Sequence, residues 1–248
     1  MDLGIKGRRA AVAAASTGLG FATAQALVAE GCTVAICGRD KERIEDAANR
    51  IGPSAVPLVV DVSSAEGGAA FVEQAVAALG SPVDILVTNA GGPPASTFDS
   101  ASIEAYRRAL ELNLMSTIGM CRAAIPAMRE AKWGRVVAIT SVVVKQPVPY
   151  LILSNTARAG VHGFVKTTST AVAFDGVTVN AVMPGAHATD RQLELYDDID
   201  AAARGVPVGR LGRPEDFGTA VAFLCGSQAG FITGSSITVD GGASSSLL

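Results

Sequence analysis

The sequence predicts an α/β fold: a doubly wound parallel sheet of about seven strands, with helices on both of its faces. Short apolar runs alternate with longer segments of helical periodicity along all 248 residues. Runs this apolar are typical of parallel strands buried on both faces, and right-handed crossovers between such strands give a doubly wound sheet. A hydrophobic fraction of 49% and 27 glycines fit such a sheet with many tight turns.

Each strand is predicted where apolar residues run together without helical spacing, and each helix where they recur every three or four residues. The predicted strands are Arg9–Ala14, Thr33–Cys37, Val56–Val60, Val83–Thr88, Arg135–Thr140, Val177–Met183 and Ser236–Val239. The predicted helices are Phe21–Glu30, Lys41–Ile51, Ala65–Leu79, Ser102–Ala131, Tyr150–Ala173 and Pro214–Cys225. Gly31, Gly52 and Gly80 follow the first three helices, as is common at helix C-termini.

The organisation along the chain is simple. We find no linker, repeat or low-complexity stretch, so residues 1–248 are expected to form one domain. Residues 186–209, which are acidic in the middle at Asp197 and Asp198, are expected to form a lid over a substrate. The last five residues, 244–248, are interpreted as a short tail.

The composition argues against several classes of function. The net charge is -3 with no block of like charges, which argues against a nucleic-acid or membrane-surface partner. The four cysteines are scattered without a CxxC pair or a histidine cluster, so we expect buried free thiols and no metal site. No apolar run approaches the ~20 residues of a membrane helix, and the first residues lack an apolar export segment, so a cytoplasmic protein is expected.

The first strand-to-helix turn, AAASTGLG, runs from Ala13 to Gly20. Gly18 and Gly20 would let the backbone approach a pyrophosphate at the positive end of the next helix, although two glycines can also simply make a turn. At Ala14, alanine is expected to replace a turn glycine only if its φ is negative. The contacts predicted in this turn are Ala14, Ser16, Thr17, Gly18, Leu19 and Gly20.

Further candidate residues follow the other predicted strands. They are Asp61 and Val62 after the third strand, Asn89, Ala90 and Gly91 after the fourth, Ser141 after the fifth, Pro184, Gly185, His187 and Thr189 after the sixth, and Asn113 in the long helix. The carboxyl ends of parallel strands meet at one edge of the sheet, where open α/β sheets bind ligands. Taken singly, residues 89–91 could be an ordinary turn and Asp61 a helix cap.

The order and the sequence spacing of these residues resemble the pattern of the short-chain dehydrogenase/reductase family. The first turn is similar to the family's TGxxxGxG, with Ala13 and Ala14 in place of Thr and the first Gly, and the run from Gly209 to Gly242 is also similar. The chain resembles 3-oxoacyl-acyl-carrier-protein reductases in particular. The resemblance implies a Rossmann-type fold, a nicotinamide dinucleotide cofactor with adenine contacts at Asp61, and a homotetramer or homodimer.

The residues after the second strand bear on which cofactor binds. An acidic residue directly at the strand end would bind the ribose 2′-hydroxyl of NAD(H), but Gly38 stands there. The guanidinium of Arg39, the next residue, suits the 2′-phosphate of NADP(H), which is therefore the expected cofactor. In the alternative, Arg39 is a solvated surface residue, Asp40 reaches the ribose and NAD(H) binds.

The resemblance breaks at the catalytic residues. The family has a Tyr thirteen residues after its Ser and a Lys four residues after that Tyr. Counted from Ser141, these positions hold Ser154 and Arg158, which is similar to a subgroup with SNxxR in place of YxxxK. A serine hydroxyl is a much weaker acid than a phenol, and Arg158 cannot relay protons although it can donate hydrogen bonds to a ribose.

Tyr150 is the first candidate for the missing proton donor, because it lies one helical turn before Ser154. Its phenol would protonate the alkoxide left by hydride transfer; alternatively, it lines the pocket or simply packs. His187 is a second candidate acid, although a place in the pocket wall explains it more simply. His162, in the middle of a predicted helix, is expected to be structural.

Two functions are open to this sequence. The first is an NADP(H)-preferring oxidoreductase that interconverts a carbonyl and a secondary alcohol, with Tyr150 or water as the proton source. In it, Ser141 and Ser154 bond the substrate oxygen, and Asn113 and Arg158 hold the ribose and a water chain. The second is a catalytically silent nicotinamide-binding sensor or scaffold, which would keep the cofactor residues beside an altered catalytic pair. The first function implies a small-molecule partner.

Overall fold

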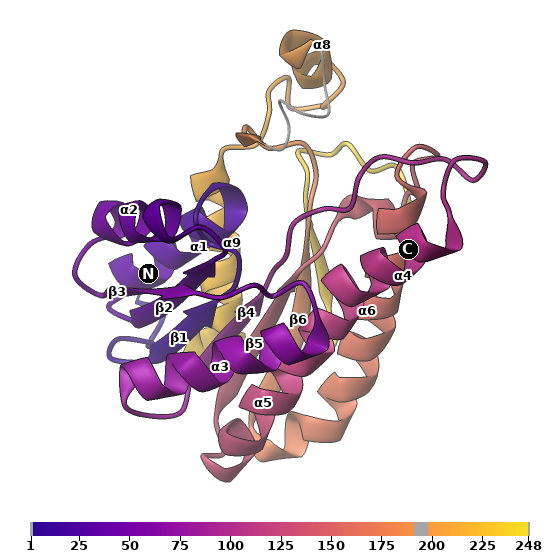
Figure 1. The fold of residues 1–248 in the computed structure, drawn as a ribbon. Coiled ribbons are helices and arrows are strands. Elements are labelled where there is room, and N and C mark those ends of the chain that lie inside the picture. The colour runs from indigo at the N-terminus through magenta and orange to yellow at the C-terminus, as the bar shows by residue number, and fades with distance from the viewer. Residues whose placement is uncertain (1, 191–197, 248) are drawn as a thin grey trace.

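The structure is a computed structural model that describes residues 2–190 and 198–247 (Figure 1). Seven parallel strands form one sheet in the order β3-β2-β1-β4-β5-β6-β7, so the chain winds outward in both directions from β1. The strands are β1 (Arg9–Val12), β2 (Thr33–Gly38), β3 (Ala55–Val59), β4 (Ile85–Thr88), β5 (Gly134–Ile139), β6 (Val177–Pro184) and β7 (Ser236–Val239). The predicted fold class is confirmed.

Helices cover both faces of the sheet (Figure 1). They are α1 (Gly18–Ala29), α2 (Lys41–Ile51), α3 (Ala65–Leu79), α4 (Ile103–Leu110), α5 (Ser116–Glu130), α6 (Ile152–Val172), α8 (Ile199–Arg204) and α9 (Pro214–Cys225). Ala10 and Val12 of β1 pack in one hydrophobic cluster with Leu27 of α1 and Phe217 of α9, whereas Ala11 packs in the cluster on the other face. Both faces of the strands are therefore buried, which explains why the runs are apolar throughout.

The long helix predicted over Ser102–Ala131 is confirmed as a continuous helical run over residues 103–130, although it is not α-helical throughout. A π-helical turn, η1 (Glu111–Met115), separates α4 from α5. Ser116 Oγ and Thr117 Oγ1 each donate to the backbone carbonyl four residues earlier, at 2.6 and 2.9 Å, and such bonds bend helices. Apolar residues keep their three- and four-residue spacing on either side of the turn, so periodicity does not reveal it.

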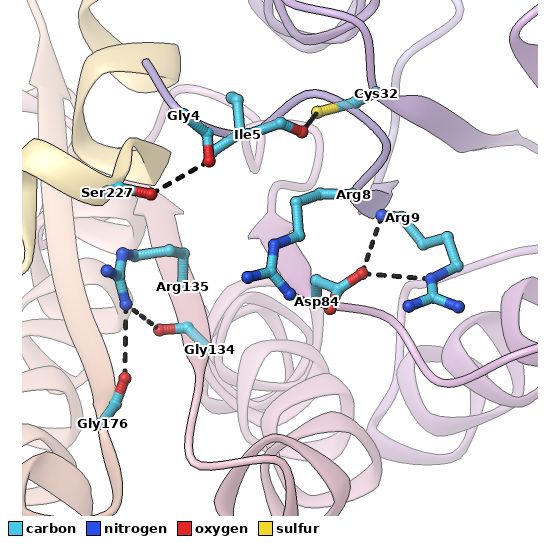
Figure 2. Close-up of polar contacts among 10 residues, drawn as sticks. All are labelled: Gly4, Ile5, Arg8, Arg9, Cys32, Asp84, Gly134, Arg135, Gly176 and Ser227. Carbon is cyan, nitrogen blue, oxygen red and sulfur yellow. Dashed lines mark hydrogen bonds and ion pairs between the residues drawn. The ribbon is translucent and has the colours of Figure 1, made fainter.

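At the edge of the sheet where the strands begin, two arginines converge on one carboxylate (Figure 2). The Asp84 carboxylate accepts hydrogen bonds from Arg8 Nη1 at 3.0 Å and Arg9 Nε at 3.1 Å, and from the Arg9 backbone N at 2.9 Å. These bonds tie the start of β1 to the start of β4.

Arg135 lies at the same edge and is only 4% exposed (Figure 2). Its Nε donates to the Gly226 carbonyl at 3.2 Å, and its Nη1 donates to the carbonyls of Gly134 and Gly176 at 2.8 and 3.3 Å. Its guanidinium also lies over the Trp133 ring, 4.5 Å from the ring centre. Burial lowers the pKa of Arg135 from its usual value, and the three carbonyls accept hydrogen bonds from Nε and Nη1 of this buried charge.

All four cysteines are free and buried, as predicted. Burial raises the pKa of the Cys32, Cys37 and Cys121 thiols to about 12 and also raises that of Cys225. Within residues 2–190 and 198–247, no group of three His, Cys, Asp or Glu side chains could hold a metal ion. No helix in those ranges is long and apolar enough to cross a membrane.

Candidate active site

A cleft of about 1300 Å³ opens where the carboxyl ends of the strands meet. The predicted cofactor residues in its wall are Ala14, Ser16, Thr17, Gly18, Leu19, Arg39, Asp61, Val62, Asn89, Ala90, Gly91, Arg158, Pro184, Gly185, His187 and Thr189. The predicted catalytic residues in its wall are Ser141, Tyr150, Ser154 and Arg158. Of the predicted residues, Gly20 and Asn113 lie outside the wall. The topology thus brings residues from six strand ends to one site.

The turn after β1 differs from the sequence expectation. Ala14 has a φ of +47°, so the expectation that alanine fits there only at negative φ is wrong. The Ala14 carbonyl accepts a hydrogen bond from Asn89 Nδ2 at 3.2 Å. A Cβ on Gly20 would lie 2.5 Å from that carbonyl oxygen and 2.9 Å from Asn89 Nδ2. Gly20 therefore lets the Ala14 carbonyl and the Asn89 amide pass close to the backbone of α1. It shapes the turn without lining the cleft itself.

The N-terminus of α1 is suited to an anion. Asp40, Ser64 and Ser102 cap α2, α3 and α4 by accepting hydrogen bonds from first-turn backbone N–H groups. In the described residues, by contrast, Thr17 makes no side-chain cap for α1, and the first turn holds no acidic residue. Backbone N–H groups and the helix dipole are thus left to face the cleft, as a pyrophosphate requires. These residues fit the phosphates of a dinucleotide.

The end of the cleft beside β2 carries two guanidinium groups. Arg39 lines it as predicted, and so does Arg43, which was not predicted although it lies four residues after Arg39, in the first turn of α2. Asp40 does not line the cleft, because its carboxylate caps α2 by accepting from the Arg43 backbone N at 3.0 Å. Asp61 is not the cap of the next helix, since its carboxylate accepts from the Ser63 backbone N at 3.0 Å and Ser64 caps α3.

Asn113, 4% exposed within η1, does not contact the cleft. Its Nδ2 donates to the Gly91 carbonyl at 3.0 Å, and its own carbonyl accepts from Thr117 Oγ1 at 2.9 Å. Asn113 thus holds the turn at residues 89–91 in place from behind, and its predicted contact with a ribose and a water chain stays a prediction.

The residues at the altered catalytic positions lie one turn apart on α6. Ser154 and Arg158 both line the cleft. Arg158 Nη1 donates to the carbonyls of Ile139 and Thr140, both at 3.0 Å, which fixes the guanidinium at the end of β5. Ser141 Oγ accepts from the Val143 backbone N at 3.3 Å and stays at the cleft wall.

Tyr150 lines the cleft, but it precedes α6, which begins at Ile152. The prediction that Tyr150 lies on the helix one turn before Ser154 is therefore wrong. Its backbone carbonyl accepts from the Ser96 backbone N at 2.9 Å, which anchors the loop, and the residue is 46% exposed. The phenol thus stands at the mouth of the cleft.

The two histidines differ in their surroundings. His187 lines the cleft, is 3% exposed, and its Nδ1 lies 3.1 Å from the Gly185 carbonyl oxygen. Burial lowers its pKa, which favours the neutral ring, and the imidazole forms part of the wall. His162 lies between Thr140 Oγ1, 2.9 Å from its Nε2, and Ser236 Oγ, 3.0 Å from its Nδ1, in the predicted structural role.

The predicted lid at residues 186–209 is only partly described, because residues 191–197, including Asp197, lie outside the described residues. Asp198, Ala201 and Ala202 at the start of α8 line the cleft, as does Val206 after it. Closure of this segment stays a prediction.

The comparisons with known proteins agree with this arrangement. A family model described as enoyl-(acyl carrier protein) reductase matches residues 13–244. The chain is 34% identical over 248 residues to 3-oxoacyl-acyl-carrier-protein reductase FabG of Aquifex aeolicus, covering 98% of this chain and 99% of the relative. L-Sorbose reductase from Gluconobacter frateurii, solved in complex with NADPH and L-sorbose, matches 100% of both chains with a TM-score of 0.93 and 30% identity.

A further structure is an NADPH-bound short-chain oxidoreductase of Pseudomonas aeruginosa PAO1, described as containing an atypical catalytic center. It has a TM-score of 0.88 and 33% identity, covering 96% of this chain and 97% of that one. Because the family model spans most of the sequence and the relatives align over nearly all of it, the chain belongs to the short-chain dehydrogenase/reductase family and is an oxidoreductase.

Proposed function

We propose that the chain is an NADP(H)-preferring reductase that interconverts a carbonyl group and a secondary alcohol. The observation that carries the cofactor preference is the pair Arg39 and Arg43 in the cleft wall, beside an Asp40 carboxylate that caps α2. Two guanidinium groups suit a 2′-phosphate, and a carboxylate engaged in a helix cap does not serve a ribose hydroxyl. The NADPH bound by the sorbose reductase and by the Pseudomonas oxidoreductase supports the same cofactor.

A nicotinamide cofactor supplies or accepts the hydride, and the residues of this chain then have to orient the substrate oxygen and provide a proton. Ser141 and Ser154 line the cleft and offer hydroxyl groups to that oxygen. Arg158, fixed by two backbone carbonyls, places a permanent positive charge where alkoxide character develops. Tyr150 at the mouth of the cleft, or water, delivers the proton.

Replacing Tyr150 tests the proton donor. Tyr150→Phe is expected to lower kcat by about 10²-fold, the usual contribution of a positioned general acid. Tyr106→Phe is the matched control, because Tyr106 lies on α4, packs against the cluster that includes Ala109 and Leu153, and does not line the cleft. If Tyr150→Phe keeps full kcat across the pH profile, water donates the proton.

Replacing Arg39 or Arg43 tests the cofactor preference. Each alanine variant is expected to weaken NADPH binding by about tenfold or more while changing NADH binding little, since one charge-assisted hydrogen bond is lost. Arg50→Ala is the control on the same helix, because Arg50 lies over the Phe21 ring and outside the cleft. Dissociation constants from nucleotide fluorescence measure both cofactors, and equal losses would refute the 2′-phosphate contact.

The second candidate is a protein that binds the nicotinamide without turnover. Ser154 in place of a phenol favours it, because the usual proton donor of the family is missing. NADPH binding and NADPH oxidation are measured side by side with a panel of ketones, aldehydes and quinones. Oxidation with any of them supports the reductase, whereas binding without oxidation by all of them supports the silent protein.

We also propose that the chain forms a homotetramer or homodimer. Phe231, just before the edge strand β7, is fully exposed, and Phe223 on α9 is 37% exposed. Exposed aromatic side chains beside an open sheet edge are typical of a surface that a second copy covers. Light scattering during size-exclusion chromatography measures the mass, and a monomer at micromolar concentration would contradict the proposal.

A further inference from the structure

The C-terminal segment Asp240–Ser246, here called the strap, runs from the end of β7 along the edge of the sheet that carries the cleft (Figure 1). The Asp240 carboxylate accepts from the backbone N of Gly242 at 2.9 Å and of Ser244 at 2.8 Å, which folds the strap into a turn. The turn starts against Gly185, where a Cβ would lie 2.5 Å from the Asp240 Cβ. The strap therefore begins beside the cofactor end of the site.

The strap then contacts the segment that follows α8 and the loop that precedes α6. The Gly241 carbonyl accepts from the Val208 backbone N at 3.2 Å, just after α8. On the other side, the backbone N and the Oγ of Ser245 both donate to Gln146 Oε1, at 2.9 and 3.2 Å. Ser244 of the strap and Gln146 both line the cleft. The strap thus forms part of the wall of the cleft.

The two bonds from Ser245 settle how the Gln146 amide is turned. A backbone N–H can only donate, so the acceptor Oε1 has to face the strap. The donor Nε2 is then on the other branch of the same amide, which leaves it directed away from Ser245. Gln146 lies in the loop that also carries Tyr150, and both residues line the cleft.

We propose that Gln146, oriented by the strap, donates a hydrogen bond from Nε2 to a second oxygen of the substrate. The enzyme then prefers carbonyl compounds that carry an uncharged hydroxyl or carbonyl oxygen next to the reacting carbon. An uncharged oxygen fits this contact because the Gln146 amide carries no charge, whereas Arg158 is proposed to serve the reacting oxygen. This inference rests on the proposed reductase function.

The test compares two ketones that differ by one hydroxyl, 1-hydroxy-2-butanone and 2-butanone. Their affinities for the full chain loaded with NADP+ are measured by calorimetry, and their kcat/KM values with NADPH are measured in parallel. The wild-type chain is expected to favour the hydroxyketone. Gln146→Glu keeps an oxygen for Ser245 but loses the donor, so the preference for the hydroxyketone should fall by about tenfold, the value of one hydrogen bond of ordinary strength.

Two variants of Ser245 test whether this residue positions the Gln146 amide. Ser245→Pro removes the backbone N–H and should lower the preference as much as Gln146→Leu does. Ser245→Ala keeps the shorter of the two bonds and should lower it less. If Gln146→Glu weakens both ketones equally, or if the Ser245 variants leave the preference unchanged, the inference is wrong. Selective ketone binding without turnover would instead contradict the reductase function and leave the Gln146 contact supported.

Discussion

Ala14 takes a left-handed backbone conformation where the chain leaves β1, with a φ of +47°. A residue with a Cβ pays roughly 1–2 kcal/mol for this conformation. The conformation is held by the Asn89 Nδ2 bond to the Ala14 carbonyl and by the close passage of Gly20. The strain therefore sits in the turn proposed to bind the pyrophosphate.

Relieving this strain should stabilise the protein. Ala14→Gly is expected to raise the free energy of unfolding by about 1 kcal/mol, because glycine adopts positive φ without a steric cost. Ala13→Gly is the control: Ala13 is buried next to it without positive φ, so glycine there should be destabilising. Urea unfolding measures both variants, and a loss of stability in Ala14→Gly would show that the turn is unstrained.

Single residues also show what a sequence can and cannot predict of a site. Position after a strand was enough to place Asp61 and Ser141 at the cleft, because parallel strands bring their carboxyl ends together. The direction of a side chain was not predictable: Asn113 turns away to Gly91 through a π-helical turn that no periodicity marks. Gln146 was missed because its partner, Ser245, is distant in sequence.

Among the elements, α6 connects the site to the edge of the sheet. Its His162 bridges Thr140 after β5 and Ser236 at the start of β7, with bonds of 2.9 and 3.0 Å. Burial, together with the nearby positive charges of Lys145 and Arg158, lowers the pKa of His162 from 6.5 to about 4. The folded protein therefore holds a neutral imidazole at this junction.

The His162 junction predicts an acid-sensitive stability. The unfolded chain binds the proton more readily, so the stability is fully present above pH 6.5 and is lost as the pH falls toward about 4. His162→Gln keeps hydrogen-bonding groups but cannot titrate, so the free energy of unfolding should depend less on pH across this range. Urea unfolding at several pH values measures the slope, and an unchanged slope would contradict the lowered pKa.

At the scale of the whole molecule, the carboxyl ends and the amino ends of the strands have different roles. The carboxyl ends of the strands form the cleft, and the opposite edge is held by Asp84 and Arg135 (Figure 2). The doubly wound class of the sheet was predictable, since alternating apolar runs and helices allow few arrangements with right-handed crossovers. The contacts at the edge where the strands begin were not predictable. Arg135 bonds backbone carbonyls there, and a backbone carbonyl leaves no mark in the sequence.

Removing Arg135 should therefore separate folding from binding. Arg135→Met leaves the carbonyls of Gly226, Gly134 and Gly176 without this donor and is expected to lower the free energy of unfolding by about 3 kcal/mol. Arg135→Lys, with a single ammonium group, should lose less. Nucleotide fluorescence should give the same NADPH affinity for the folded variants, and a large change in that affinity would show that the two edges are coupled.

The four buried thiols described above give the protein its own set of reporters. A thiol with a raised pKa and no solvent contact resists alkylation and oxidation until its surroundings open. Cys37 lies at the nucleotide cleft, whereas Cys121 and Cys225 lie on helices that cover opposite faces of the sheet. The order in which a reagent labels them therefore records which part of the native molecule loosens first, with no label added by engineering.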